Sequence, residues 1–320
     1  MKDGDRQSTP DFRAELAGTA EQLGIPALAV EKDYWVTRAL RGLAEMHPGS
    51  IIFKGGTSLT KGWRIGHRFS EDIDLLIVER PVPDSLNGRE TILKRICATG
   101  ANACGSAPER LMGGKGEHRT VKVAYPAHFA SDETLLDHIR LELGYSGGPA
   151  PTEVRMLTPL VAEALVDAGA DISGNPDLRP FGVTCLHPGR TLIEKIMILN
   201  SKIGPLTSRQ EIVANRMARH FYDVHELLGD QRVLDLLEDR AVFDGIVEEH
   251  LSVSESFGGS ARRPIGGFAE SYAFNSSGAH RKESQGAYTE GIDALYYGPL
   301  TEMPTWKAVE DRVRASAVLL

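Results

Sequence analysis

Two aspartates separated by one residue are the most chemically suggestive feature of this chain. Asp72 and Asp74 open an apolar run that predicts a buried strand. Side chains two positions apart in a strand point to the same face, so the two carboxylates would share one side, with Cα atoms roughly 6–7 Å apart. Carboxylates placed in this way can bind a hard divalent cation such as Mg²⁺ (or Mn²⁺), which takes a few carboxylates together with substrate phosphates.

A run of four small residues precedes the aspartates: Gly55, Gly56, Thr57 and Ser58. Glycines let a backbone approach a phosphate closely, and their N–H groups, with the Ser58 hydroxyl and a following helix start, would cradle it. Each part alone is compatible with a plain turn or a strand end. The joint order of strand, Gly-Gly-Thr-Ser, short helix, Asp-x-Asp and strand favours a site that binds a metal and a phosphate.

The composition is that of an ordinary globular protein. The chain has 320 residues, of which 41% are hydrophobic and 25% charged, enough for two modest domains or one large one. There is no apolar run of membrane-spanning length and no apolar core of a signal peptide at the N-terminus. Three cysteines without a Cys-x-x-Cys pair favour a reduced thiol set. We therefore expect a cytoplasmic protein.

The charge distribution is uneven. A net charge of −8 argues against nucleic-acid binding over the whole surface. Residues 91–128, however, carry six Lys or Arg against two Glu, a local net charge of +4. This segment, together with the basic groups at 262–263 and 280–282, could contact a polyanion such as RNA, or could form solvated loops and helix faces.

Periodicity divides the elements into two halves. Residues 1–150 predict two N-terminal helices and then a sheet, with helices at 10–24, 27–46 and 87–99 and strands at 51–53, 75–78, 120–125 and 138–143. Residues 105–118 predict a loop. Residues 151–320 predict a mainly helical domain, with helices at 153–170, 190–203, 209–228, 232–249 and 306–320. A Gly/Ser-rich loop is expected at about 252–286.

The full motif resembles the nucleotidyltransferases of the AbiEii/AbiGii toxin family. The matching runs are 54–59 and 68–75, and three further segments match in order: 31–36, 194–196 and 219–224. This family includes the mycobacterial MenT toxins and belongs to the DNA polymerase β-like nucleotidyltransferase superfamily. The resemblance covers roughly residues 25–240. It implies an α+β (α/β) fold, in which a mixed sheet flanked by helices is followed by a C-terminal helical domain.

The resemblance also implies an activity. Members are toxins of type IV-like toxin–antitoxin and abortive-infection systems. The implied reaction is Mg²⁺-dependent transfer of a nucleotide from an NTP to an RNA acceptor, with the 3′ end of tRNA as the first candidate and an antitoxin encoded nearby as a partner. Transfer to a protein hydroxyl and a non-catalytic nucleotide- or partner-binding module remain alternatives. A glycosyltransferase is disfavoured, because its Asp-x-Asp would normally follow a nucleotide-binding βαβ unit.

Residue by residue, the resemblance implies that Asp72 and Asp74 bind the metal. It implies that Gly56 and Ser58 contact the triphosphate, within the nucleotide-binding run that starts at Gly55. Arg68 and Glu71 flank the acids and would orient substrate or stabilise the loop. Such enzymes usually add a third carboxylate from a neighbouring strand. Glu142, which points away from the apolar residues of its predicted strand, is the candidate for it, or else an ordinary exposed strand residue.

Two residues on later helices complete the predicted site. Lys195 lies in an apolar helical stretch, where it would extend to water or pair with an anion such as an NTP phosphate. Asp223 would position Lys195 or Arg219, or contact the nucleotide. An ordinary intrahelical Arg219–Asp223 pair is the alternative. We therefore expect an NTP site between a sheet domain and a helical domain.

Overall fold

The structure is a computed structural model of the chain. It describes residues 10–70, 72–130, 136–204, 207–256, 261–274, 279–293 and 295–320. The chain divides into two compact units. The first, which we call the sheet unit, comprises Met1–Gly62, Ser70–Ser146 and Thr152–Cys185. The second, the helical unit, comprises Trp63–Phe69, Gly147–Pro151 and Leu186–Leu320.

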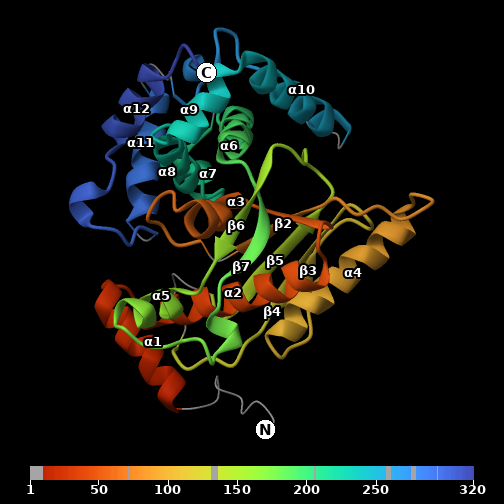
Figure 1. Ribbon diagram of the computed structural model, residues 1–320. Coiled ribbons are helices and arrows are strands. Elements are labelled where there is room, and N and C mark those ends of the chain that lie inside the picture. The colour runs from red at the N-terminus through yellow and green to blue at the C-terminus, as the bar shows by residue number, and fades with distance from the viewer. Residues whose placement is uncertain are drawn as a thin grey trace. The chain divides into compact units, whose positions relative to one another are not determined.

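One mixed sheet forms the centre of the sheet unit (Figure 1). Within the described residues it has seven strands in the order β3-β4-β5-β2-β1-β7-β6. Strand β2 is antiparallel to β1 and parallel to β5, so the predicted mixed sheet flanked by helices is confirmed. The strands are β1 (Ile51–Lys54), β2 (Asp72–Ile77), β3 (Glu109–Met112), β4 (His118–Val123), β5 (Ile139–Gly144), β6 (Thr152–Leu157) and β7 (Phe181–Leu186).

The sheet has one apolar and one charged side near its centre. Helices α2 (Ala27–Met46) and α4 (Leu86–Ala103) pack against each other and against β5 (Figure 1). A Cβ on Gly100 would lie 2.9 Å from Leu141, so α4 contacts the sheet closely on this side. Because strand side chains alternate, the buried Ile73 and Leu75 leave Asp72 and Asp74 on the opposite face. Helices α1 (Pro10–Leu23) and α5 (Leu160–Asp167) pack beside α2.

Two carboxylates on α2 hold neighbouring segments of the same unit in place. Glu31, which is fully buried, accepts hydrogen bonds from the backbone N–H groups of His128 and Phe129 at 2.7 and 3.2 Å. Asp33 accepts one from the N–H of Leu160 at 2.7 Å. A buried carboxylate is tolerated when its oxygens are hydrogen-bonded in this way. The predicted N-terminal helix with its Glu-Lys-Asp run therefore has a structural role.

The sheet extends further along the chain than the sequence predicts. Residues 153–170 were expected to form one helix, but they form strand β6 and then α5. Residues 105–118, expected to form a loop, contain β3, and β7 lies where no strand was predicted. The sheet therefore includes residues up to 186, which lie beyond the predicted domain boundary at residue 150. The reason is non-local: β7 is held by pairing with β1, about 130 residues earlier, which local periodicity does not report.

The helical unit is built around helix α8, which contacts α6, α11 and α12. The predicted helix over 209–228 is interrupted, and Arg216 at the break has a positive φ of 54°. The Gly/Ser-rich segment is only partly loop, because α10 runs through Ser256 and α11 begins at Ala279. The helices are α6 (Pro188–Lys202), α7 (Arg209–Ala214), α8 (Ala218–Leu227), α9 (Gln231–Glu238), α10 (Arg240–Ser256), α11 (Ala279–Ile292) and α12 (Trp306–Ala315).

No described helix combines the length and the apolar character needed to cross a membrane.

Candidate active site

The two aspartates lie within strand β2 itself, at its first and third positions. Asp72 is buried and Asp74 half-buried. Asp74 is paired in register with Lys54 of β1 on one side and with Glu142 of β5 on the other. In-register neighbours share a face, so the charged face carries Asp72, Asp74 and Glu142 together.

Gly55 allows the Asp74 carboxylate to approach the backbone. Its φ of +76° is a conformation that favours glycine, and a Cβ at this position would lie 2.1 Å from Asp74 Oδ2. Gly55 also begins the short helix α3 (Gly55–Thr57), which continues into a π-helical turn over Ser58–Trp63. The predicted turn is thus the start of a helical segment. Ser58 Oγ donates to the Gly55 carbonyl at 3.0 Å and closes its first turn.

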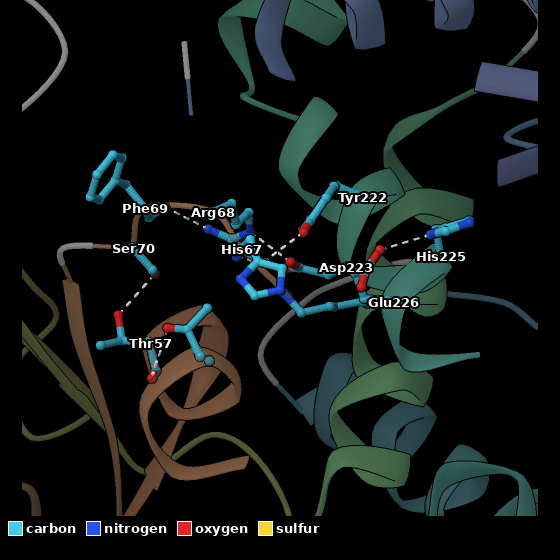
Figure 2. A network of polar contacts seen from close by, with 12 residues as sticks. Thr57, His67, Arg68, Phe69, Ser70, Tyr222, Asp223, His225 and Glu226 are labelled. Atoms are coloured by element: carbon cyan, nitrogen blue, oxygen red, sulfur yellow. Dashed lines mark hydrogen bonds and ion pairs between the residues drawn. The ribbon is translucent and has the colours of Figure 1, made fainter. Parts of the chain in front are cut away.

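Thr57 fixes the beginning of β2. Its hydroxyl donates to the backbone carbonyl of Asp72 at 2.5 Å and shares a 2.8 Å hydrogen bond with the Ser70 hydroxyl (Figure 2). These bonds connect α3 to the segment that leads into the first aspartate. Glu71, the other predicted flanking residue, lies outside the described residues.

Glu142 is paired with a cation of its own strand. Arg140 Nη2 donates to Glu142 Oε1 at 2.5 Å, and Arg140 Nε lies 3.9 Å from Asp72 Oδ1. Among the described residues, no three His, Cys, Asp or Glu side chains are grouped closely enough to hold a metal ion. The assignment of Glu142 as a third metal ligand therefore stays a prediction.

The donor set nevertheless fits a hard divalent cation. Asp72 and Asp74 offer carboxylate oxygens on one face, and the glycine backbone beside Asp74 leaves its carboxylate room. Mg²⁺ characteristically takes one or two carboxylates and completes its octahedral shell with water and substrate phosphates. Two aspartates are therefore a sufficient protein contribution.

Arg68, Lys195 and Asp223 form a buried ionic cluster in the helical unit. Arg68 donates to Asp223 through Nε at 2.6 Å and through Nη2 at 2.7 Å, and Figure 2 shows these contacts. Lys195 Nζ lies 2.7 Å from Asp223 Oδ2. The side chains are only 4%, 8% and 5% exposed, respectively. The structure thus places Asp223 as the common partner of Lys195 and Arg68.

The charges in this cluster depend on one another. Burial alone would raise the pKa of the Asp223 carboxyl, but the Arg68 guanidinium and the Lys195 ammonium hold that pKa well below its usual range. Burial lowers the pKa of Lys195, and Asp223 opposes that shift. Burial, reinforced by Lys195 and Arg219, holds the pKa of His220 well below its ordinary value. The lowered pKa favours the neutral form of His220 near Arg68 and Lys195, the two cations that share the Asp223 carboxylate.

Residues that the sequence did not single out hold the loop around Arg68. The Tyr222 hydroxyl accepts a hydrogen bond from the His67 N–H at 2.7 Å (Figure 2). The Phe69 N–H donates to the Leu295 carbonyl at 2.8 Å, and Arg68 forms a β-bridge with Tyr296. In the sequence, the Tyr-Asp pair at 222–223 was the one signal that could have pointed to these contacts. Nothing in the sequence pointed to residues 295–296, because β-bridges between distant segments leave no local pattern.

Several predicted RNA contacts are engaged within the protein. Arg119 lies 2.6 Å from Glu90 and is mostly buried. Arg263 and Arg281 pair with Asp244 and Glu310 at 2.8 and 2.5 Å. Lys94 also lies 3.6 Å from Glu90, but its side chain is 61% exposed. The role of these basic segments stays a prediction, and exposed side chains such as Lys94 are its best remaining candidates.

Comparison with solved structures finds the same fold in a known toxin. MenT4, described as a nucleotidyltransferase toxin from Mycobacterium tuberculosis H37Rv, aligns over 96% of this chain and 88% of its own, with 18% identity and a TM-score of 0.60. JHP933 from Helicobacter pylori aligns over 88% of this chain and 94% of its own, with 13% identity and a TM-score of 0.31, which is too low to compare sites. Comparison with curated proteins returned no match.

The mixed sheet with its paired aspartates is the framework of a nucleotidyltransferase, and this chain is an enzyme of that class. Residues 38–312 match the family described as "Nucleotidyl transferase AbiEii toxin, Type IV TA system", and the chain belongs to that family. Nucleotidyltransferases use an NTP and generally a divalent metal. Membership of a toxin–antitoxin family implies an antitoxin partner.

Proposed function

We propose that this toxin transfers a nucleotide monophosphate from an NTP to the 3′ end of a tRNA in a Mg²⁺-dependent reaction, and so stops translation. The observation that carries the proposal is the placement of Asp72 and Asp74 on one face of β2, with the Gly55 backbone against Asp74. The family supports nucleotidyl transfer. The metal and the acceptor are our proposal, and both substrates would be met in the cytoplasm.

In this reaction a hydroxyl oxygen of the acceptor forms a bond to the α-phosphorus while the α–β phosphoanhydride bond breaks. The hydroxyl proton passes to solvent, and pyrophosphate leaves with the electron pair of the broken bond. Mg²⁺ held by Asp72 and Asp74, with Glu142 as the proposed third ligand, would favour ionisation of that hydroxyl and neutralise charge on the phosphates. The role of the two aspartates is to hold the cation, and the role of Gly55 is to let the Asp74 carboxylate approach the backbone.

The phosphate-binding role falls to two sets of residues. The N–H groups at the start of α3, Gly55 and Gly56, together with Ser58, are suited to phosphate oxygens. In the helical unit, Arg68 and Lys195 carry two positive charges against the single negative charge of Asp223. A buried surplus of positive charge favours a polyanion. We assign Lys195 to the triphosphate and Asp223 to positioning Lys195 and Arg68.

The test is a transfer assay with each of the four α-labelled NTPs and total tRNA, followed by separation of RNA from protein. We expect label in tRNA, dependent on Mg²⁺, and a loss of at least roughly 10³-fold in Asp72→Asn. Asp167→Asn is the control, because Asp167 is an exposed carboxylate of the same unit at the end of α5. It should transfer like the wild type.

Two results would contradict the proposal in different ways. Full activity of purified Asp72→Asn would overturn the metal-dependent mechanism. Label in the protein fraction, with none in tRNA, would instead identify a protein hydroxyl as the acceptor and leave the mechanism intact.

A further inference from the structure

A cation lies among the carboxylates of the charged sheet face. Strands β2 and β5 are parallel, and their register places Arg140 beside Asp72 and Glu142 beside Asp74. In-register residues on adjacent strands share a face. The four side chains therefore form a two-by-two array on which three are acidic and one is basic.

The guanidinium of Arg140 contacts two of these acids. Its Nη2 donates to Glu142 Oε1 at 2.5 Å, and its Nε lies 3.9 Å from Asp72 Oδ1. The Arg140 side chain is 26% exposed, so it has room to move without disrupting the core. A divalent cation on the same oxygens would be repelled by a guanidinium at this distance. Arg140 and a metal ion are therefore alternative partners for these carboxylates.

The strand order indicates which substrate the Arg140 guanidinium would meet if a metal ion displaced it from the carboxylates. The phosphate-binding run at 55–58 follows β1, on one side of β2, whereas Arg140 is on β5, on the other. Beyond Arg140, the next strand carries Lys122 in register with it, on the same face, 31% exposed and 3.8 Å from the exposed carboxylate of Asp137. Attacking and leaving oxygens lie roughly in line in phosphoryl transfer, so the acceptor enters opposite the leaving pyrophosphate. With the pyrophosphate at the 55–58 run, the acceptor would therefore approach from the Arg140–Lys122 side.

We infer that Arg140 binds the RNA acceptor after a metal ion displaces it from the sheet carboxylates. Without metal, the Arg140 guanidinium pairs with Asp72 and Glu142. Once displaced, it binds a phosphate of the RNA acceptor together with Lys122. A guanidinium suits this role, because its planar fork matches two phosphate oxygens. The inference rests on the proposed metal-dependent transfer to RNA. It assigns to Arg140 a role in binding the second substrate.

The first experiment measures metal affinity without NTP or RNA, by titration of the protein with Mn²⁺ followed by electron paramagnetic resonance. Arg140→Gln removes the competing charge and should bind Mn²⁺ about tenfold more tightly than the wild type. Arg140→Lys keeps the charge and should stay close to the wild-type affinity. Lys122→Gln, which lies on the same face one strand away, should leave it unchanged. An unaltered Mn²⁺ affinity in Arg140→Gln would overturn the inference that Arg140 competes with the metal ion for these carboxylates.

The second experiment separates the two substrates in steady-state kinetics. Arg140→Gln and Lys122→Gln should each raise the KM for tRNA about tenfold while the KM for NTP changes little. A raised KM for NTP with an unchanged KM for tRNA would overturn the assignment to the acceptor. Failure of the proposed function has a different signature: the wild type would transfer no label to tRNA, while the Mn²⁺ titration and its response to Arg140→Gln would remain.

Discussion

The carboxylate face of the sheet unit and the ionic cluster of the helical unit are built in opposite ways. Asp72 and Asp74 are two residues apart, and the period of a strand sets their common face. Arg68 and Asp223 are 155 residues apart and meet only because the chain folds around them. Of the sheet acids, Asp74 is half-buried and keeps some access to water, whereas Asp72 and the three cluster side chains are buried. The carboxylate face is formed by residues that are close in sequence. The ionic cluster joins residues that are distant in sequence and that depend on one another for charge compensation.

This difference has energetic consequences. A half-buried carboxylate such as Asp74 is partly solvated, so its removal costs little stability. In the cluster, one carboxylate satisfies two buried cations, and removing it leaves both uncompensated. We therefore expect substitution of Asp74 to affect mainly transfer, and substitution of Asp223 to affect folding as well.

The largest effect is expected for Asp223→Ala. Leaving Arg68 and Lys195 buried without an anion should lower the free energy of unfolding by about 3–5 kcal/mol. Urea denaturation measures this change. Asp235→Ala, at an exposed position on the next helix, is the control and should change stability by less than about 0.5 kcal/mol. A loss for Asp223→Ala no greater than this control would show that the cluster does not support the fold.

An intermediate effect is expected for Gly55→Ala. The positive φ and the 2.1 Å approach to Asp74 should together cost about 2 kcal/mol and reduce transfer, because the Asp74 carboxylate must move. Gly49→Ala separates the two causes, since Gly49 has a φ of +69° but no neighbour within 4 Å of its Cβ position. Gly49→Ala should therefore be less stable than the wild type but should keep wild-type nucleotide transfer. Full transfer by Gly55→Ala would show that the close approach is dispensable.

The smallest change in stability is expected for Lys195→Met. Asp223 keeps both hydrogen bonds from Arg68, and burial already disfavours the charged form of Lys195, as its lowered pKa indicates. We expect less than about 1 kcal/mol in urea denaturation, together with a loss of nucleotide transfer. Lys202→Met, at an exposed position near the end of the same helix, should change neither. Destabilisation as large as that of Asp223→Ala would mean that Lys195, and not Arg68, is the main partner.

Much of the local structure follows from the sequence. The helix over 27–46 has the predicted bounds, because its apolar spacing, its preceding proline and its following Pro-Gly are all local signals. The shared face of Asp72 and Asp74 follows from the strand period alone. By contrast, β6 was predicted as helix, because pairing at the sheet edge overrides local preference.

Which groups meet was decided by tertiary structure. The sequence analysis proposed Lys195 or Arg219 as the partner of Asp223 and left an intrahelical Arg219–Asp223 pair open. It did not connect Arg68 with Asp223, because spacing along a helix shows only neighbouring partners. Folding brought Arg68 to both oxygens of Asp223 and placed Arg140 among the sheet acids. The sequence by itself determined the types of the groups and the face of the two aspartates. Contacts between distant segments, which depend on burial and strand register, determined their partners.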